Sequence, residues 1–295
     1  MPQRLARLIV NPISGGGRGE ALLPPVRRAV EGLGYETDVV MTGKKGDARE
    51  AARTGGGDGV SVFVILGGDG TISEVVNGLN GHPTPICVVP VGTANCLTKE
   101  FGQSADVEAA VRRIESMRTR MLDSFEVNGE RGLLFAGAGL DGEVGRKVCE
   151  ARNGRLSVMS YVLPLFRTML HYRFPKFSVE IDGERVEEDA TFAEVSNVST
   201  YGGPIRLAPE ARADDGALDV LIMNTWRRVR ILGYLAQSCL LNRVHGENLL
   251  LLRGREIRMT SAHEVPYQVD GDFAGYLPLE IRVLPKSVCV VVDPA

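Results

Sequence analysis

Short apolar runs alternate with amphipathic stretches over about the first 120 residues of the chain. Residues 60–66 are almost all apolar or β-branched, which is typical of a strand buried on both faces of a sheet. Helix-like segments follow these runs, and such strand–helix alternation predicts a parallel sheet with helices on both sides. We expect strands at 5–10, 36–41, 60–66 and 86–89, and helices at 21–33, 47–53, 72–79 and 107–114.

The pattern changes at about residue 121, where short alternating strands are joined by turns such as Asp182-Gly183. Alternation of this kind predicts an antiparallel, β-rich second domain. We expect its strands at 121–127, 132–136, 177–181, 192–195, 218–223, 257–259, 267–269, 279–283 and 288–292, and helices only at 160–171 and 229–241. The predicted fold class is α/β, with a parallel-sheet domain at 1–122 and an antiparallel domain at 123–295, whose last strand could return to the first.

Glycine is the one unusual component, at 35 of 295 residues, or about 12% against a usual value of roughly 7%. The net charge of −3 argues against a general nucleic-acid binder. The five cysteines are odd in number and include no C-x-x-C pair, which favours reduced, buried thiols in a cytoplasm. Neither a signal peptide nor a run of roughly 20 apolar residues is visible, so we expect any membrane contact to be peripheral.

Glycine-bearing loops directly follow the predicted parallel strands, at residues 11–17, 67–71 and 91–95, with a less glycine-rich one at 42–46. Because ligands of an open parallel sheet bind beyond the carboxyl ends of its strands, we expect these loops to share one edge. Backbone N–H groups in such loops suit phosphate oxygens, so together they predict a nucleotide site. Residues 56–59 also form a glycine run, but they precede their strand and are interpreted as an ordinary turn.

Each loop alone is a weak signal, because a glycine loop after a strand is often only a tight turn. Asp69, in the Gly-Gly-Asp-Gly-Thr run, is more informative: a carboxylate beside phosphates makes sense if it holds Mg²⁺ or orients the ligand. No P-loop motif is present, and the G-x-G-x-x-G at 137–142 lacks the strand–helix–strand context of a dinucleotide site. The four histidines show no metal-ligand spacing, and no G-x-S-x-G is found.

Several of these motifs together resemble the diacylglycerol kinase catalytic family, which includes bacterial lipid kinases and sphingosine and ceramide kinases. They are Asn11-Pro12-x-Ser14-Gly15, Gly67-Gly68-Asp69-Gly70-Thr71, Pro90-x-Gly92-Thr93-Ala94-Asn95, Gly137-x-Gly139-x-Asp141, Asp214-Asp215-Gly216-x-Leu218-Asp219 and Val269-Asp270-Gly271-Asp272. The likeness covers essentially the whole chain. The Gly-Gly-Asp-Gly-Thr run is shared with NAD kinases and related to phosphofructokinases, whereas the first and the Asp-Asp-Gly motifs favour lipid kinases.

The resemblance implies an N-terminal nucleotide domain, a C-terminal β-sandwich and an active site in the cleft between them. It implies ATP contacts at Asn11, Pro12, Ser14, Gly15, Thr42, Gly67, Gly68, Asp69, Gly70, Thr71, Ser73, Gly92, Thr93 and Asn95. It also implies a structural Mg²⁺ at Asp215, with backbone oxygens of Arg212 and Ala217 as further ligands. Read without the resemblance, Asp214-Asp215-Gly216 is a turn.

Asp270-Gly271-Asp272 would supply the base that receives the proton of the acceptor hydroxyl, with Asp69 in a catalytic role near the metal. Relatives commonly carry glutamate at the third position, so the identity of the base is open between Asp270 and Asp272. An Asp-Gly pair between strands is also a strong hairpin signal, and a hairpin can present a carboxylate.

The expected function is an ATP-dependent lipid kinase of phospholipid metabolism that phosphorylates a hydroxyl of a lipid such as diacylglycerol. An NAD kinase-like or other small-molecule kinase on the same scaffold is the alternative, and a non-catalytic regulator is a third class. Diacylglycerol, phosphatidylglycerol, sphingoid bases and polyprenols all offer a hydroxyl. Nucleic acid is not an expected partner, and exposed strand edges leave a homodimer open.

We expect a cytoplasmic protein that acts peripherally at the inner membrane face. Two segments combine aromatic and cationic residues in the way that suits a lipid headgroup layer, namely 161–177 and the region of Trp226, Arg227, Arg228 and Arg230. Packing of these segments on the core is the ordinary alternative. A lipid cavity inside the second domain is equally compatible with the sequence.

Overall fold

The computed structural model describes residues 4–104, 106–150, 159–202 and 205–294. Contacts divide the chain into two units, Met1–Leu122 with Lys286–Ala295 and Asp123–Pro285. The predicted fold class is confirmed, because the first unit is built on parallel strands and the second on antiparallel ones. The chain passes from one unit to the other in strands β5 (Thr119–Val127) and β16 (Leu279–Val291).

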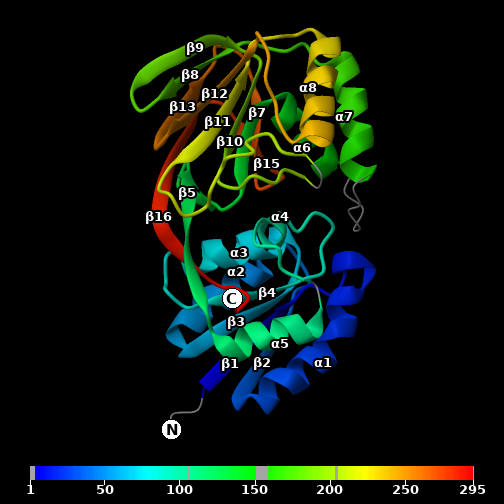
Figure 1. Cartoon of the computed structure of the whole chain (residues 1–295), viewed down its shortest axis with the longest axis vertical. Helices are drawn as coiled ribbons and strands as arrows, with labels where there is room; N and C mark the ends of the chain where they lie inside the picture. The colour runs from blue at the N-terminus through cyan, green and yellow to red at the C-terminus, as the bar shows by residue number, and fades with distance from the viewer. Residues whose placement is uncertain (1–3, 105, 151–158, 203–204, 295) are drawn as a thin grey trace. The chain divides into compact units, whose positions relative to one another are not determined.

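The first unit is a parallel sheet covered by helices on both faces (Figure 1). Its strands lie in the order β2-β1-β3-β4, and β4 pairs with the end of β16. Their bounds are β1 Arg4–Val10, β2 Tyr35–Met41, β3 Val60–Gly67 and β4 Ile86–Pro90. The helices are α1 Arg18–Gly32, α2 Asp47–Gly57, α3 Asp69–Leu79, α4 Cys96–Glu100 and α5 Val107–Ser116. Helices α1 and α5 pack together on one face, and α2 and α3 on the other.

The second unit contains two antiparallel sheets that face each other across an apolar core. One sheet joins the start of β16 to β13 (Glu256–Thr260), β8 (Phe177–Ile181) and β9 (Glu184–Ala190), with β5 and β6 (Glu130–Gly132) beside β16. The other has the order β12-β11-β10-β7-β14-β15. Its strands are β7 Phe135–Gly139, β10 Phe192–Ser196, β11 Leu218–Met223, β12 Leu249–Gly254, β14 Pro266–Val269 and β15 Asp272–Tyr276.

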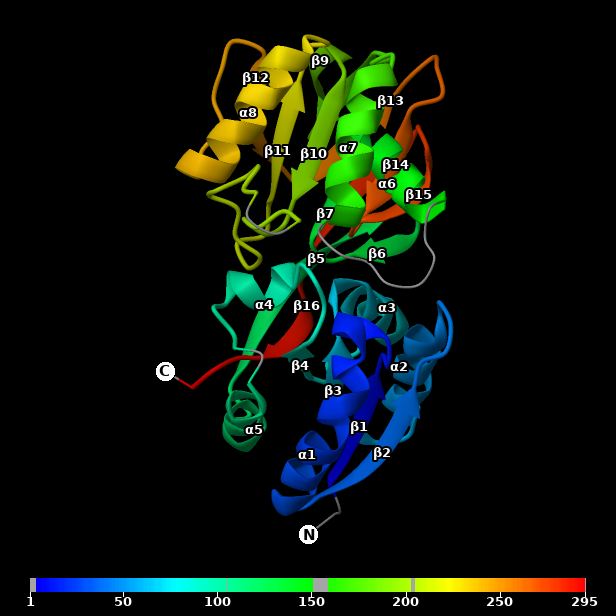
Figure 2. The ribbon, with the colours of Figure 1, turned by 90° about the vertical axis from the view of Figure 1, so that its right-hand side faces the viewer.

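Three helices cover the outer face of this six-stranded sheet: α6 Leu140–Glu150, α7 Met159–His171 and α8 Arg228–Leu241 (Figure 2). They bury Val144, Met169 and Ile231 against Phe192 and Leu221 of the sheet. Apolar side chains on both faces of β7, β10 and β11 are therefore covered, on one face by the opposite sheet and on the other by helices.

The structure corrects several of the expected elements. The prediction of only two helices in the second domain was wrong, because α6 begins directly after β7. Its glycines weaken the helical signal, yet a side chain at Gly142 would overlap the backbone of Pro266 on β14, so the close approach requires them. The strands expected at 279–283 and 288–292 are one continuous strand, β16. Strands β9, β12 and β15 and helix α4 were not anticipated.

The cysteines are only partly as predicted. Cys87 and Cys96 are buried, and burial raises the pKa of the Cys87 thiol to about 11. Cys149 and Cys239 are exposed, so the expectation of five buried thiols was wrong. Both lie on helices whose other faces are packed, a placement that composition does not reveal.

Candidate functional site

Three of the predicted loops meet at the carboxyl edge of the parallel sheet. The Asn11 backbone N–H donates to Leu66 O at 3.0 Å, and its side-chain amide donates to Thr71 Oγ1 at 3.3 Å. The second and third loops touch through backbone, since a Cβ added at Gly92 would lie 2.5 Å from Gly68 Cα. The loops at 11–17, 67–71 and 91–95 therefore form one continuous surface of backbone.

Glycine is required where the first loop turns. Gly15 has a left-handed backbone, with φ of 58°, and a side chain there would overlap the carbonyl oxygen of Val91. Only glycine satisfies the dihedral angle and the space together. The turn brings the backbone of Ser14–Gly16 against the third loop and leads into α1.

Asp69 has a structural role that the sequence did not reveal. It is the first residue of α3, and its carboxylate accepts hydrogen bonds from the backbone N–H groups of Cys96 at 3.1 Å and Leu97 at 3.5 Å. These N–H groups open the short helix α4, whose preceding residue Asn95 is left-handed and donates its amide to Gly92 O at 2.9 Å. Asp69 thus ties the second loop to the third, and its predicted part in holding Mg²⁺ remains a prediction.

The fourth loop lies beside the first, and two of its backbone N–H groups donate to a carboxylate in the same loop. Both the N–H and the hydroxyl of Thr42 donate to Val10 O, at 2.9 and 3.3 Å, which places Thr42 next to Asn11. The N–H groups of Gly43 and Lys44 donate to the Asp47 carboxylate at 2.7 and 2.9 Å, and they lower the pKa of that group. These two donors are used inside the loop, and the predicted contact of Thr42 with ATP remains a prediction.

The remaining predicted nucleotide contacts lie on the same loops and on α3. Pro12 and Ser14 are half-buried, Thr93 is exposed, and Gly67 is packed against Thr71. Ser73 lies on α3, where its carbonyl accepts a bond from Asn77. Since α3 begins at Asp69, its N-terminal end lies at this edge, which is the end of a helix that suits phosphate.

In the second unit, Asp270 and Asp272 lie at the tip of the β14–β15 hairpin. Asp270 has a left-handed backbone, with φ of 52°. Its carboxylate accepts from the backbone N–H groups of Leu133, Leu134 and Phe135, the shortest at 2.8 Å. Asp272 is the first residue of β15, is half-buried, and pairs with Val269 across the turn. The expected hairpin is confirmed, and the choice of the base between Asp270 and Asp272 remains a prediction.

A row of buried polar groups on the neighbouring strands is hydrogen-bonded to this hairpin. Glu194 on β10 and Gln268 on β14 both face Gly137 on β7, so the three residues form a line across neighbouring strands. A side chain at Gly137 would overlap the carboxyl groups of Asp141 and Glu194. Gln268 donates to Asp141 Oδ2 at 2.6 Å and accepts from the Gly271 N–H at 2.7 Å. The turn that carries Asp270 and Asp272 is thereby tied to Asp141.

Asp141 and Glu194 form a buried carboxyl pair in which the pKa of each group is raised. Glu194 is fully buried, and among the described residues neither of its carboxylate oxygens has a hydrogen-bond donor. Burial first, and then the neighbouring Asp141, raise the pKa of Glu194 well above its ordinary value. Burial also raises the pKa of Asp141, which accepts hydrogen bonds from Tyr201 and Gln268. A protonated Glu194 that donates to Asp141 satisfies both groups.

The predicted metal loop is organised by Asp123 and Arg253. Asp123 accepts the Gly216 N–H at 2.6 Å, and its own N–H donates to Ala213 O at 2.6 Å. Arg253 forms an ion pair with Asp215 and lies 3.6 Å from Asp219, whose carboxylate is buried. The acids supply oxygen atoms of the kind that Mg²⁺ prefers.

These side chains do not by themselves form a magnesium site. No group of three or more His, Cys, Asp or Glu residues in the described part of the chain is placed to hold a metal ion. Asp215, the one predicted side-chain ligand, already has a cationic partner in Arg253. The predicted ligation by Asp215 with the backbone oxygens of Arg212 and Ala217 therefore remains a prediction, and Arg253 is its competitor.

Sequence reasoning missed Asp123, Glu194, Gln268, Tyr201 and Arg253. A signal existed for Glu194, which is the single acid of a largely apolar strand-like run. Buried acids are rare unless they have a partner, so each such acid points to a polar network. Their partners come from distant segments and could not be identified from one sequence.

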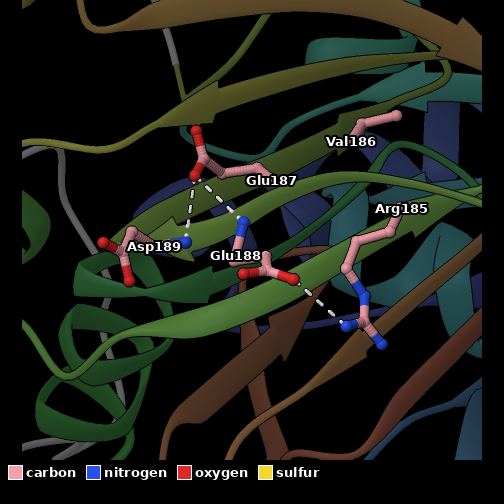
Figure 3. Close-up of a pocket in the computed structure, with 5 residues that line it drawn as sticks. All are labelled: Arg185, Val186, Glu187, Glu188 and Asp189. Carbon is pink, nitrogen blue, oxygen red and sulfur yellow. Dashed lines mark hydrogen bonds and ion pairs between the residues drawn. The ribbon is translucent and has the colours of Figure 1, made fainter.

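A shallow pocket along β9 lies away from all of these residues (Figure 3). It is lined by Arg185, Val186, Glu187, Glu188 and Asp189. Glu187 accepts from the N–H groups of Glu188 and Asp189, and Arg185 pairs with Glu188 at 3.2 Å. No predicted site residue lines this pocket, and its excess of carboxylates is unsuited to phosphate.

Comparison with known proteins matches both units. Residues 5–127 match the family described as diacylglycerol kinase catalytic domain, and residues 135–292 match the YegS C-terminal NAD kinase beta sandwich-like domain. A protein named diacylglycerol kinase from Bacillus subtilis (strain 168) is 27% identical over 97% of this chain and 95% of its own length. One of the same name from Mycobacterium tuberculosis (strain ATCC 25618 / H37Rv) is 25% identical over 96% of this chain and 93% of its own.

The fold is also found in a solved structure. The crystal structure of a diacylglycerol kinase from Bacillus anthracis str. Sterne matches 100% of this chain and 98% of that chain, with a TM-score of 0.77 and 20% identity. At this identity the likeness shows the fold alone, a parallel-sheet domain followed by a YegS-like β-sandwich. Three observations point to the same family. The two family matches occur in the right order, the relatives align over nearly their full length, and the motif loops meet at one edge of the sheet. The chain belongs to the diacylglycerol kinase-like family.

Proposed function

We propose that this chain transfers the γ-phosphoryl group of ATP to a hydroxyl of a lipid such as diacylglycerol. The observation that carries the proposal is the joining of three glycine-bearing loops at the carboxyl edge of the parallel sheet, where Gly68 and Gly92 touch and Asn11 reaches Thr71. Membership of a kinase family implies a phosphotransferase that uses ATP. The relatives' name, diacylglycerol kinase, supplies the acceptor class for the proposal.

The proposal assigns phosphate binding to the first unit. Backbone N–H groups of the joined loops and of the first turn of α3 would hold the phosphate oxygens. Asp69 fixes the spacing of the second and third loops through its bonds to Cys96 and Leu97. Rigid loops matter because phosphoryl transfer depends on positioning and on charge stabilisation rather than on covalent help from the protein.

The proposal assigns the proton acceptor to the second unit. A lipid hydroxyl is too weak an acid to ionise before transfer, so a carboxylate has to collect its proton as the phosphoryl group moves. Asp270 and Asp272 are the candidates. Their hairpin is held by the three N–H bonds to Asp270 and by the bond from the Gly271 N–H to Gln268.

No helix among the described residues is long and apolar enough to cross a membrane. We therefore propose that a lipid acceptor is met at a membrane surface, by peripheral contact.

The test is transfer of radiolabelled phosphate from ATP, with Mg²⁺, to diacylglycerol in mixed vesicles, with phosphatidylglycerol, a sphingoid base, a polyprenol and NAD as parallel acceptors. We expect labelled phosphatidic acid from diacylglycerol. Label in NAD alone would replace the lipid proposal with an NAD kinase-like one. Label in no acceptor, with ATP binding intact, would indicate a regulator.

A further inference from the structure

Helix α8 is apolar on two opposite faces. Ile231, Tyr234 and Ser238 are buried against the sheet, as a helix that covers a core requires. The outer face carries Val229, Leu232 and Leu240, which are 82%, 38% and 79% exposed. A helix that is apolar all round is normally buried on all sides, so this outer face lacks the covering that its composition calls for.

Helix α7 extends the same exposed apolar surface. Its Phe166 and Leu170 are 50% and 64% exposed, and both helices cover the same sheet (Figure 2). Arg228 joins them by donating to the carbonyl oxygens of Met169 at 2.7 Å and Leu170 at 3.2 Å, at the end of α7. Both outer faces point away from the sheet that the two helices cover.

The two helices and the residues next to them in sequence carry only basic charges, of which Lys176 pairs with Asp189 of β9 at 2.7 Å. Residues 159–176 and 226–243 contain seven arginine or lysine residues and no aspartate or glutamate, in a chain whose net charge is −3. Arg230 pairs with Glu247 at 3.7 Å, and Arg228 is used by α7. The exposed Arg167, Arg227 and Arg243 have no acidic partner among the described residues. Beside them is Trp226, the only tryptophan of the chain, which is 63% exposed and lines a shallow pocket with Arg227 and Val229.

We propose that this outer surface of α7 and α8 docks on a lipid bilayer that contains anionic lipids. The surface is defined by Phe166, Leu170, Trp226, Val229, Leu232 and Leu240, with Arg167, Arg227 and Arg243 at its border. Apolar side chains would enter the interface, the indole would lie at the headgroup level, and the guanidinium groups would meet lipid phosphates. The inference extends the proposed function, because the acceptor proposed above resides in a bilayer.

A second copy of the chain is a poorer occupant. In a twofold dimer the same patch faces itself, so the arginines of one copy would meet those of the other. The patch offers no carboxylate to pair with them. An anionic bilayer supplies both the apolar layer and the missing negative charge.

Trp226 allows the unmodified protein to test the docking surface. Its fluorescence should shift to shorter wavelength with phosphatidylcholine vesicles that contain phosphatidylglycerol, and much less with phosphatidylcholine alone, because the indole leaves water only when the surface docks. Added salt should weaken the effect. Neither ATP nor acceptor is present, so the result does not depend on kinase activity. Co-sedimentation with these vesicles without a change in Trp226 emission would place the membrane contact elsewhere and overturn the proposal.

Three surface variants supply the second test, namely Val229→Glu, Leu240→Glu and Arg227→Gln. We expect each to weaken co-sedimentation with the anionic vesicles by about tenfold, since apolar insertion and each arginine contribute separately. Matched controls are Met121→Glu and Arg28→Gln, which alter exposed residues outside the patch and should bind as the unaltered protein does. All should retain the Tm of the unaltered protein, because these side chains are solvent-exposed.

Transfer to a monomeric short-chain acceptor in solution separates docking from chemistry. If the proposed function holds, the docking variants should keep the activity toward this acceptor. Absence of that activity in the unaltered protein would contradict the proposed kinase function and leave the docking proposal untouched. Vesicle binding by the variants equal to that of the unaltered protein would overturn the docking surface. So would a dimer that the variants convert to monomer, because the patch would then be an interface between copies.

Discussion

The loops of the first unit and the acids of the second are built in opposite ways. The loops are made of backbone: contiguous residues in three short motifs, packed so closely that Gly15, Gly68 and Gly92 leave no room for a side chain. The buried acids are held by side chains from β10, β14 and α6 together with Tyr201, and Gln268 links the hairpin to Asp141. A site made of backbone is formed by contiguous residues and can be recognised as a local motif, whereas a network of side chains is formed by residues that lie far apart along the chain.

The two regions should therefore fail in different ways. Added atoms should damage the loops, because the constraint there is space. Changes of charge should alter the acids while the volume stays the same, because the constraint there is the placement of protons. The experiments below use this contrast.

The largest expected effect is at the hairpin. Asp270→Asn and Asp272→Asn preserve volume and remove one carboxylate each, and we expect one of them to lower kcat by about 10²- to 10⁴-fold with ATP binding retained, as loss of a general base does. Measured turnover with vesicle-borne diacylglycerol identifies which. If both variants turn over normally, the base has been misplaced.

Stability separates the two carboxylates independently of turnover. Asp270 accepts three backbone N–H bonds, so its amide variant should lower the free energy of unfolding by about 1–2 kcal/mol. Asp272→Asn, measured in parallel, shows whether this loss is particular to Asp270. An unaltered free energy of unfolding in Asp270→Asn would show that the three bonds do not anchor the turn.

The next largest expected effect is on the contact between the second and third loops, at Gly68 and Gly92. Gly92→Val adds atoms where the nearest neighbour is the backbone of Gly68, so we expect a loss of about 2–3 kcal/mol in stability together with weaker ATP binding. Gly57→Ala is the control, because nothing lies within 4 Å of a Cβ there, alanine is the better helix residue, and Gly57 lies outside the predicted nucleotide contacts. Titration of a fluorescent ATP analogue and urea unfolding measure both quantities. Similar behaviour of the two variants would mean that the loops do not depend on close approach.

How much the sequence could predict follows from the same contrast. Residues 60–66 are apolar enough to identify a buried strand, and the parallel fold makes the loops after such strands converge, so the meeting of Asn11, Gly68 and Gly92 could be predicted. Helix α4 could not, because five residues carry too little periodicity to be recognised. The hydrogen bonds from the first turn of α4 to Asp69 could therefore not be predicted either.

The buried acids show why the rest could not be predicted. Glu194, Gly137 and Gln268 are neighbours only through the register of β10, β7 and β14. The strand expected at 132–136 ends one residue before Gly137, so the row could not be seen. A one-residue change of register sends a side chain to the other face of a sheet, and sequence patterns fix strand ends too loosely for that.

The carboxyl pair predicts an effect on stability that depends on pH. The folded state holds a proton on Glu194 that the unfolded chain releases above its ordinary pKa of 4.5. The contribution of this group is therefore fully present below pH 4.5 and declines as pH rises toward the raised folded pKa. Glu194→Gln removes that decline, so its free energy of unfolding relative to that of the unaltered protein should be higher at pH 8 than at pH 5 by at least about 1 kcal/mol.

Urea unfolding at the two pH values measures this effect, and Glu188→Gln on the exposed strand β9 is the control. That variant should behave as the unaltered protein does at both pH values, because the Glu188 carboxylate is in water. Equal losses of stability in Glu194→Gln at pH 5 and pH 8 would show that no proton is held in the pair.

The smallest expected effect decides between a metal and an arginine at Asp215. The reference concentration is ten times the Mg²⁺ concentration that half-saturates the site in the Arg253→Gln variant. Because Arg253 already neutralises the Asp215 carboxylate, this concentration should raise the stability of the unaltered protein by less than about 1 kcal/mol. In Arg253→Gln the carboxylate is released, and the same Mg²⁺ concentration should then add about 1.4 kcal/mol, the value for a site that binds only the folded state. Thermal unfolding with and without Mg²⁺ measures the gain, and Asp215→Asn in the Arg253→Gln background should abolish it. A large gain in the unaltered protein would show that the ion displaces Arg253, and the second unit would then be organised by a metal in addition to its buried acids.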